Sequence, residues 1–294
     1  MARPAEGRSR GAPGPPDFIG VGTPGDGTAW WRKLLFAHPE IRPPKTHRRG
    51  GVDFFRDFAT AEMTQAHEAA YHALFRRVPG KICGEWTGRY MLDAWTVPLL
   101  ARVAPEARLI VMVGDPIIRY RVVVATRHRS FAPTRTYRTT DIAERLCHAS
   151  QLARLHRFFD PDRILVLQYE RCLRDRAGEY RRTLQFLGVR DLGHLPARRR
   201  HRPPPTRLSQ QAARVARLGL PGRAARRAAE LVVREPLGRA ELPLWPGLEA
   251  SLHTALDPEI ERLAELVPDL DLTLWPSFAH LAGERRSAAL DNPV

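Results

Sequence analysis

Apolar positions along the chain follow two different periods, and the two kinds of stretch alternate. Short runs rich in β-branched residues indicate buried strands, and they occupy residues 17–22, 81–86, 108–114 and 163–169. Amphipathic stretches with a period near 3.6 indicate helices, and they occupy residues 28–38, 64–77, 93–104, 141–159 and 177–189. Strands that alternate with helices predict an α/β fold in three layers, α/β/α, around a central parallel sheet.

Residues at the ends of these stretches predict where helices start and stop. Asp93 precedes an amphipathic stretch and is a candidate N-cap. Asp115 and Pro116 follow an apolar run and are expected to open a further helix, because proline in the first turn removes no intrahelical hydrogen bond. Gly188 is expected to end the last of the helical stretches given above.

The pattern divides the chain into one large domain and two polar ends. We expect a disordered leader at residues 1–16, which are rich in Pro, Gly and charge and lack the apolar core of a secretory signal. A single domain is expected over residues 17–283 and a flexible tail over residues 284–294. The basic, proline-rich stretch 197–207 predicts a loop or extended arm. No apolar run approaches the roughly 18 residues of a membrane helix, so we expect no membrane partner.

Charge narrows the classes of partner. The chain carries 47 Lys plus Arg against 32 Asp plus Glu, a net charge of +15, which attracts nucleic acid, anionic lipid, nucleotides or sulfated products. An arginine excess is also typical of a GC-rich coding sequence. A nucleic-acid-binding protein is disfavoured, because we find no recognised module and no run of aromatics among the basic residues. Cys83, Cys147 and Cys172 have no metal or redox spacing, which favours buried apolar cysteines and a cytoplasmic location.

Residues 22–28 reproduce the spacing of a phosphate-binding loop. Gly22 is followed by four residues and then by Gly27 and Thr28, between an apolar strand and an amphipathic helix. Glycines in such a loop let backbone N–H groups converge on an anion, and the helix N-terminus adds its positive end. Nucleoside triphosphatases carry a lysine and a magnesium-binding hydroxyl after the second glycine, where Thr28 and Ala29 stand here. An ordinary ATPase or kinase is therefore disfavoured, and no metal is expected.

The ordered set of motifs resembles the sulfotransferases that use 3′-phosphoadenosine 5′-phosphosulfate (PAPS), and in particular bacterial, heparan-sulfate-sulfotransferase-like members. Residues 18–41 are similar to the family's 5′-phosphosulfate loop with a helix that ends in His-Pro-Glu-Ile, and residues 108–124 to its 3′-phosphate-binding strand and helix. Three further stretches agree in order, at residues 84–92, 164–189 and 263–278. The resemblance implies a P-loop NTPase-like sulfotransferase fold, PAPS as co-substrate and no metal.

The resemblance also implies a set of residues that contact the donor nucleotide, namely Gly22, Gly25, Asp26, Gly27, Thr28, Ala29, Trp30, Gly114, Arg119 and Val122. Several of these positions lack the chemistry that the family has there. The cation of the first loop falls at Gly25, and the arginine that binds the 3′-phosphate falls at Gly114. Thr28 remains the best phosphate contact, because both its hydroxyl and its backbone N–H can donate. We expect weakened nucleotide binding, and both phosphate-binding segments at the same edge of the sheet.

The catalytic base is a second departure from the family. Some bacterial members carry Lys-Glu-Leu-His-Phe-Phe after the first helix and use its glutamate as general base; here Gly51 matches that glutamate and Asp53 the histidine. Glu85 and Asp53 are the candidate replacements. Glu85 is preferred, because it stands at a strand end that the resemblance places near the sulfuryl group, whereas Asp53 is short and lies on a glycine-flanked loop. An N-cap or ion-pair role for Glu85 and an ordinary loop position for Asp53 are the alternatives.

Other side chains are candidates to replace the missing charge or to line the site. The candidate cations, each with a solvated position as the alternative, are Lys45, His47, Arg119, Arg121, Arg127 and the basic arm 198–207. Trp30 and Trp86 are candidates for stacking on an adenine or acceptor ring, with core packing as the alternative.

Two functions remain in view. The first is transfer of a sulfuryl group from PAPS to a hydroxyl or amine of a carbohydrate or small metabolite. The second is a catalytically weak or inactive pseudoenzyme that binds a nucleotide or a partner protein, which the missing cations and base favour. The acceptor and the oligomeric state stay open at this point, since acceptor specificity comes from loops that vary freely on such a scaffold.

Overall fold

The computed structural model describes residues 11–22, 28–46, 51–121, 144–196 and 246–283. At its centre is a five-stranded sheet in the order β2-β3-β1-β4-β5, and every pair of neighbouring strands is parallel. The strands are β1 (Phe18–Gly20), β2 (Ile41–Arg42), β3 (Ile82–Trp86), β4 (Arg108–Val113) and β5 (Ile164–Gln168). The predicted parallel sheet is confirmed.

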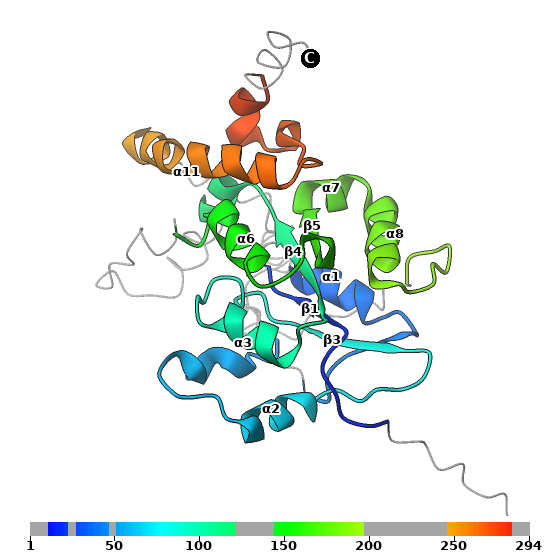
Figure 1. Ribbon diagram of the computed structural model, residues 1–294. Helices are drawn as coiled ribbons and strands as arrows, with labels where there is room; N and C mark the ends of the chain where they lie inside the picture. The colour runs from blue at the N-terminus through cyan, green and yellow to red at the C-terminus, as the bar shows by residue number, and fades with distance from the viewer. Residues whose placement is uncertain (1–10, 23–27, 47–50, 122–143, 197–245, 284–294) are drawn as a thin grey trace, which may run out of the picture.

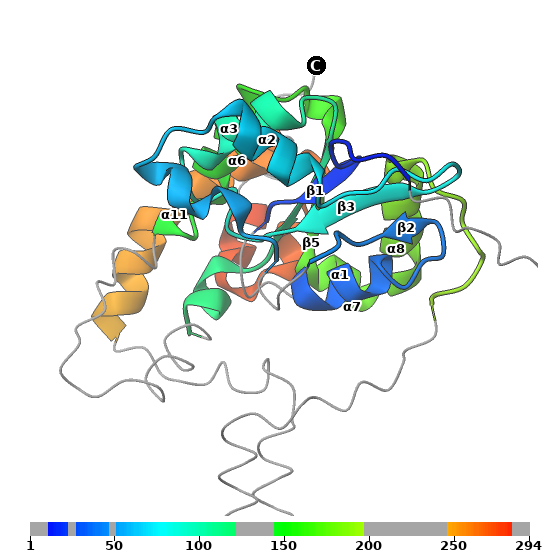
Figure 2. The same ribbon diagram turned by 90° about the horizontal axis from the view of Figure 1, so that it is seen from below.

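Helices cover both faces of this sheet, as the α/β/α prediction requires (Figure 1, Figure 2). The helices on one face are α1 (Thr28–Leu35), α7 (Tyr169–Arg174) and α8 (Arg176–Leu187). Those on the other face are α2 (Gln65–His72), α3 (Thr96–Val103), α6 (His148–His156) and α11 (Pro246–Leu266). The structure also has short 3-10 helices: η1 (Phe54–Ala59), η2 (Pro161–Arg163), η4 (Leu272–Leu274) and η5 (Pro276–Phe278).

Alternation along each strand assigns its side chains to one core or the other. In β1, Phe18 lies in the core beneath α1, and its neighbour Ile19 lies in the core of the opposite face. In β3, Trp86 belongs to the α1 side, and Glu85 points to the face that Tyr71 of α2 covers. Full burial of a large apolar side chain contributes about 1.5–3 kcal/mol. The two cores therefore hold the carboxyl ends of these strands in fixed positions.

The local signals at helix ends are confirmed at two places and wrong at a third. Asp115 Oδ1 accepts the N–H groups of Ile117 (3.0 Å) and Ile118 (3.1 Å), and residues 116–121 are helical. Gly188 caps α8 in the left-handed conformation, with a φ of 68°. Asp93, however, is not an N-cap. Arg89 Nε donates a hydrogen bond to its carboxylate at 2.9 Å, and α3 begins only at Thr96.

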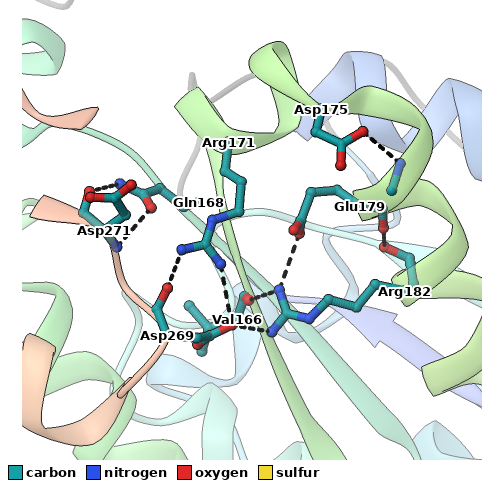
Figure 3. A network of polar contacts seen from close by, with 10 residues as sticks. Val166, Gln168, Arg171, Asp175, Glu179, Arg182, Asp269 and Asp271 are labelled. Atoms are coloured by element: carbon teal, nitrogen blue, oxygen red, sulfur yellow. Dashed lines mark hydrogen bonds and ion pairs between the residues drawn. The ribbon is translucent and has the colours of Figure 1, made fainter. Parts of the chain in front are cut away.

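A polar network fastens the segment after α11 to β5, α7 and α8 (Figure 3). Gln168 at the end of β5 exchanges two hydrogen bonds with the backbone of Asp271, at 2.8 and 3.1 Å. Asp269 pairs with Arg182 of α8 at 2.8 Å and with Arg171 of α7 at 3.5 Å. Residues 269–271 are thereby fixed beside the carboxyl end of β5.

The described part of the N-terminal region begins inside the expected leader. Ala12 accepts a hydrogen bond from Arg77 N–H (2.9 Å), and Pro13 forms a bridge with Arg76. Residues 11–16 therefore belong to the folded part, in contrast to the predicted boundary at residue 17, because they pair with the end of the α2 region. The basic arm 197–207 and the tail 284–294 lie outside the described residues. Within the described residues, no helix has the length and apolar character needed to cross a membrane.

Candidate active site

The carboxyl ends of β3, β1 and β4 bring the predicted site segments to one edge of the sheet. Gly20 is in register with Trp86 of β3 on one side and with Ile110 of β4 on the other. β1 stands between β3 and β4 although both come later in the chain, and ligands of parallel sheets bind where the strand order reverses in this way. Gly22 comes just after β1 and Gly114 just after β4, so both lie at this edge. The prediction of a shared edge is confirmed for these two residues.

The described ends of the phosphate loop are Gly22 and Thr28. A Cβ atom on Gly22 would lie 2.4 Å from the backbone nitrogen of Met112, so β1 approaches β4 too closely here for any side chain. Thr28 is the first residue of α1 and is 8% exposed, so it lies at the positive end of the helix. Gly25, Asp26 and Gly27 lie outside the described residues.

The next two residues of α1 differ in their surroundings. Ala29 is exposed. Trp30 packs edge-on against Trp31, with ring centroids 5.2 Å apart, and the Arg176 guanidinium lies 5.0 Å above its ring. Trp30 thus packs between α1 and α8, which favours its packing alternative over adenine stacking.

Gly114 is bordered by a buried arginine. A Cβ atom on Gly114 would lie 3.4 Å from Arg119 Nε and 3.3 Å from Glu170 Oε1, so these two side chains fill the space beside the glycine. Arg119 is 8% exposed. Burial lowers its pKa to about 9, against the opposing effect of the Glu170 carboxylate, so Arg119 stays positively charged at neutral pH.

The other candidate cations are tied elsewhere or lie outside the described residues. Arg121 Nη2 lies 2.6 Å from Glu249 Oε1 of α11, in an ion pair. Lys45 Nζ donates to the carbonyl of Ala73. His47 and Arg127 lie outside the described residues, and so does the predicted nucleotide contact Val122. Arg119 is therefore the described candidate that lies closest to the expected 3′-phosphate position.

Glu170 joins three segments at this edge, and the sequence interpretation did not find it. Its carboxylate accepts hydrogen bonds from Asp115 N–H (3.1 Å) and from Trp275 Nε1 (2.7 Å). Ser277 N–H donates in turn to Asp115 Oδ2 at 3.0 Å. Burial raises the pKa of Glu170, with these hydrogen bonds acting in the opposite direction. Its position directly after an apolar strand, the usual place for ligand contacts in parallel sheets, was the signal that could have identified it.

Glu85 is enclosed by hydroxyl groups. It is 0% exposed, and its carboxylate accepts hydrogen bonds from Tyr71 (2.7 Å), Thr87 (2.7 Å) and Tyr90 (3.3 Å). Burial raises its pKa to about 7, and the hydroxyl donors act against that rise. A carboxylate that is fully buried and hydrogen-bonded to three hydroxyl groups is poorly placed to touch an acceptor, so Glu85 is no longer the preferred candidate for the base.

The segment 51–54, which matches the family's catalytic motif, is held by Thr87. Thr87 Oγ1 accepts the N–H groups of Val52 (3.0 Å) and Asp53 (3.2 Å) while it donates to Glu85. Gly51 has a φ of 108°, and a Cβ there would lie 2.3 Å from Thr87 Oγ1. Position 51 therefore admits only glycine in this arrangement, and the glutamate of the family motif has no room there.

Asp53 combines backbone strain with an unsatisfied carboxylate oxygen. Among the described residues it is the one non-glycine residue with a positive φ, 52°. Its Oδ1 is buried and has no hydrogen-bond partner among those residues, while Oδ2 lies 3.9 Å from Arg56 Nη1. Strained residues and orphaned polar atoms are concentrated at functional sites. These two features favour Asp53 over Glu85 as the group that meets a ligand.

Trp86 lies in the core. It is 3% exposed, and a Cβ on the neighbouring Gly20 would lie 2.1 Å from its ring. The missing side chain of Gly20 makes room for this ring, so packing, rather than stacking on an acceptor, accounts for Trp86.

Comparisons with known proteins agree with this architecture. The profile of the sulfotransferase family matches residues 16–192, which is more than half of the chain. A search of curated proteins finds no match. A sulfotransferase from Alicyclobacillus acidocaldarius is 18% identical, with 88% of this chain and 98% of that chain covered and a TM-score of 0.59. The sulfotransferase STF9 from Mycobacterium avium is 14% identical, with coverages of 85% and 77% and a TM-score of 0.48. The first of these structures shows the same fold, and the chain belongs to the sulfotransferase family.

Proposed function

We propose that the chain transfers a sulfuryl group from PAPS to a hydroxyl or amine of a carbohydrate or small metabolite. The observation that carries this proposal is the arrangement at the sheet edge, in a chain of the sulfotransferase family. Gly22 and Thr28 flank the loop after β1, and Gly114 and Arg119 follow the adjacent parallel strand β4. Two anion-binding segments on neighbouring strands suit a nucleotide with phosphates at both its 5′ and 3′ positions.

The residues at this edge fit the donor in charge and in chemistry. Thr28 offers a hydroxyl and the positive end of α1 to the 5′-phosphosulfate. Arg119 offers a buried positive charge beside the position where the family has its 3′-phosphate arginine. Hydrogen bonds to charged groups contribute about 1.5–3 kcal/mol each. Arg119 therefore compensates for part of the charge that Gly114 lacks.

Asp53 is the general base in this proposal. Its carboxylate accepts the acceptor's proton as the acceptor oxygen or nitrogen bonds to sulfur. The bond between sulfur and the bridging oxygen of the 5′-phosphate breaks, and 3′-phosphoadenosine 5′-phosphate (PAP) leaves with that electron pair. Glu85 acts indirectly, as a positioning residue. It accepts a hydrogen bond from the Thr87 hydroxyl, which in turn accepts the backbone N–H groups of Val52 and Asp53.

The cysteines support a reducing compartment, and we propose the cytoplasm. All three cysteines are free. Burial is the main cause that raises the pKa of Cys83 to about 12 and of Cys147 to about 11, so neither thiol is reactive near neutral pH.

The test is transfer of labelled sulfate from PAPS to a panel of sugar, phenol and amine acceptors. Wild type, Asp53→Asn and the matched control Asp57→Asn, an exposed acid of η1, are compared side by side. A general base typically contributes about 10²–10⁴ in rate, so Asp53→Asn should lose that much while Asp57→Asn keeps the wild-type rate. Full activity of Asp53→Asn would reject Asp53 as the general base. Failure of the wild-type protein to transfer sulfate to any acceptor would reject the proposed sulfotransferase activity.

A further inference from the structure

A group of three potential metal ligands lies outside the candidate active site. His253 and Asp257 stand one helical turn apart on α11, and His280 follows η5 near the end of the described chain. Figure 1 shows α11 in orange and the C-terminal residues in red beside it. One nitrogen of each histidine and one carboxylate oxygen of Asp257 all lie within 4.8 Å of one another.

We propose that His253, Asp257 and His280 bind a divalent transition metal of the zinc type. His253 Nδ1 lies 3.1 Å from Asp257 Oδ1, and His280 Nε2 lies 3.2 Å from Asp257 Oδ2. Zinc bonds of about 2.0–2.2 Å in tetrahedral geometry put neighbouring ligand atoms about 3.3–3.5 Å apart. The two contacts use different oxygens of Asp257, so a small rotation of the carboxylate must bring one oxygen within reach of both histidine nitrogens for three ligand atoms to hold the ion.

The ligand types decide the kind of metal. Two imidazoles and one carboxylate suit zinc and related transition metals, whereas magnesium and calcium prefer sets made of oxygen alone. The group has three side chains among the described residues, which leaves a fourth tetrahedral position for water. The side chains of His253 and Asp257 are 28% and 30% exposed and that of His280 is 45% exposed, so an ion can enter from solvent.

Packing holds the two histidine rings in place. Phe278 is fully buried, and its ring lies 5.5 Å from the ring of His253 and 6.3 Å from that of His280. Ligands that are fixed before the ion arrives lose less conformational entropy on binding.

The metal has a structural role in this proposal. It joins α11 to residues 276–282, the segment in which Ser277 N–H donates to Asp115 at the edge of the sheet. Binding of the ion to the folded chain raises stability by mass action. The site is independent of the proposed sulfuryl transfer, since no ligand belongs to the candidate active site.

The experiment measures zinc binding to the untagged full-length protein by competition with a chromophoric chelator, together with Tm by differential scanning fluorimetry. Wild type should bind one Zn²⁺ per chain. Its Tm should rise by about 5 °C at a free zinc concentration of about 100 times Kd, and Mg²⁺ should have no effect. Loss of an outer-shell partner typically weakens binding 10–100-fold, so His253→Ala, Asp257→Asn and His280→Gln should each weaken it by at least about 100-fold.

The matched control is His194→Ala, which removes an exposed histidine from a different part of the fold. It should bind zinc with the wild-type affinity. His280→Gln and Asp257→Asn change partly exposed side chains, so each variant's metal-free Tm should stay near wild type and affinity can be compared between folded proteins. Absence of zinc binding in wild type, or equal binding by wild type and all three ligand variants, would overturn the site and leave ordinary hydrogen bonds between the histidines and Asp257.

Discussion

Glu85→Gln should remove a pH dependence of stability that wild type carries. Burial raises the pKa of Glu85 from 4.5 to about 7. Between these two values the folded protein holds a proton on Glu85 that the unfolded chain has released. The free energy of unfolding therefore falls as pH rises through this window, because the folded state binds more protons there. The stabilisation is fully present below about pH 4.5 and is lost once the pH passes about 7.

The size of the effect follows from the pKa shift. One pKa unit corresponds to about 1.4 kcal/mol, so ionised Glu85 costs the folded state about 3 kcal/mol above pH 7 relative to pH 4.5. Glutamine has no proton to lose and keeps the volume of the side chain. It also replaces an acceptor of the Thr87 hydroxyl with a donor, which adds a fixed cost of about 1–3 kcal/mol. This fixed cost cancels when the mutant difference at pH 8.5 is compared with the difference at pH 4.5.

The assay is urea unfolding of wild type and Glu85→Gln at intervals between pH 4 and pH 9. The difference in free energy of unfolding should shift in favour of the mutant by about 3 kcal/mol across the range. Glu62→Gln, at an exposed glutamate, is the matched control and should show a constant difference. Parallel pH profiles for wild type and Glu85→Gln would refute the assignment of this titration to Glu85.

Three further predictions concern the edge of the sheet. Gly51→Glu, which restores the family residue, should destabilise the fold by about 3 kcal/mol or more in urea unfolding, because a Cβ there would lie 2.3 Å from Thr87 Oγ1 at a positive φ. The matched control is Gly80→Glu, which has a φ of 69° but no atom within 4 Å of the Cβ position, and it should cost only about 1–2 kcal/mol. A similar cost at both glycines would show that the contact with Thr87 Oγ1 does not restrict position 51. Gly114→Arg should change PAP affinity by less than tenfold in calorimetry, since Arg119 Nε lies 3.4 Å from the Cβ position; a gain above 100-fold would show that Arg119 does not substitute. Arg119→Lys keeps the charge but loses the planar fork, and should weaken PAP binding about tenfold or more; unchanged affinity would remove Arg119 from the site.

The sheet was predictable where a strand lies within a longer apolar run, and the two-residue strand β2 was missed. β1, β3, β4 and β5 appear as apolar runs, because helices cover them on both sides. β2 has two residues beside prolines, and α7 follows β5 with no polar interval, so neither leaves a pattern. The stretch 141–159 predicted one long helix, but among the described residues the helix is interrupted at residues 145–147, and α6 runs from His148 to His156. Asp93 failed as a cap because Arg89, one turn earlier, competes for its carboxylate.

Some residues of the candidate site could likewise be predicted from the sequence, and others could not. Gly22, Thr28 and Gly114 could be placed from sequence, because strand ends and helix starts carry local signals. The position of Glu170 after an apolar strand is visible in the sequence, but its partners Asp115 and Trp275 are not, since they lie 55 and 105 residues away. The shift of preference from Glu85 to Asp53 also required tertiary structure: burial and hydroxyl partners are not visible in a strand pattern. The likeness to heparan-sulfate sulfotransferases stays a prediction.

Calorimetric titration of the wild-type protein with PAP and with adenosine 5′-phosphate tests the central claim most directly. The two ligands differ only in the 3′-phosphate, which we assign to the Arg119 guanidinium beside Gly114. One charged hydrogen bond is worth about 1.5–3 kcal/mol, so PAP should bind about 10–100 times more tightly than adenosine 5′-phosphate. Equal affinity for the two, or no binding of PAP, would contradict the proposal that this edge of the sheet holds the donor nucleotide.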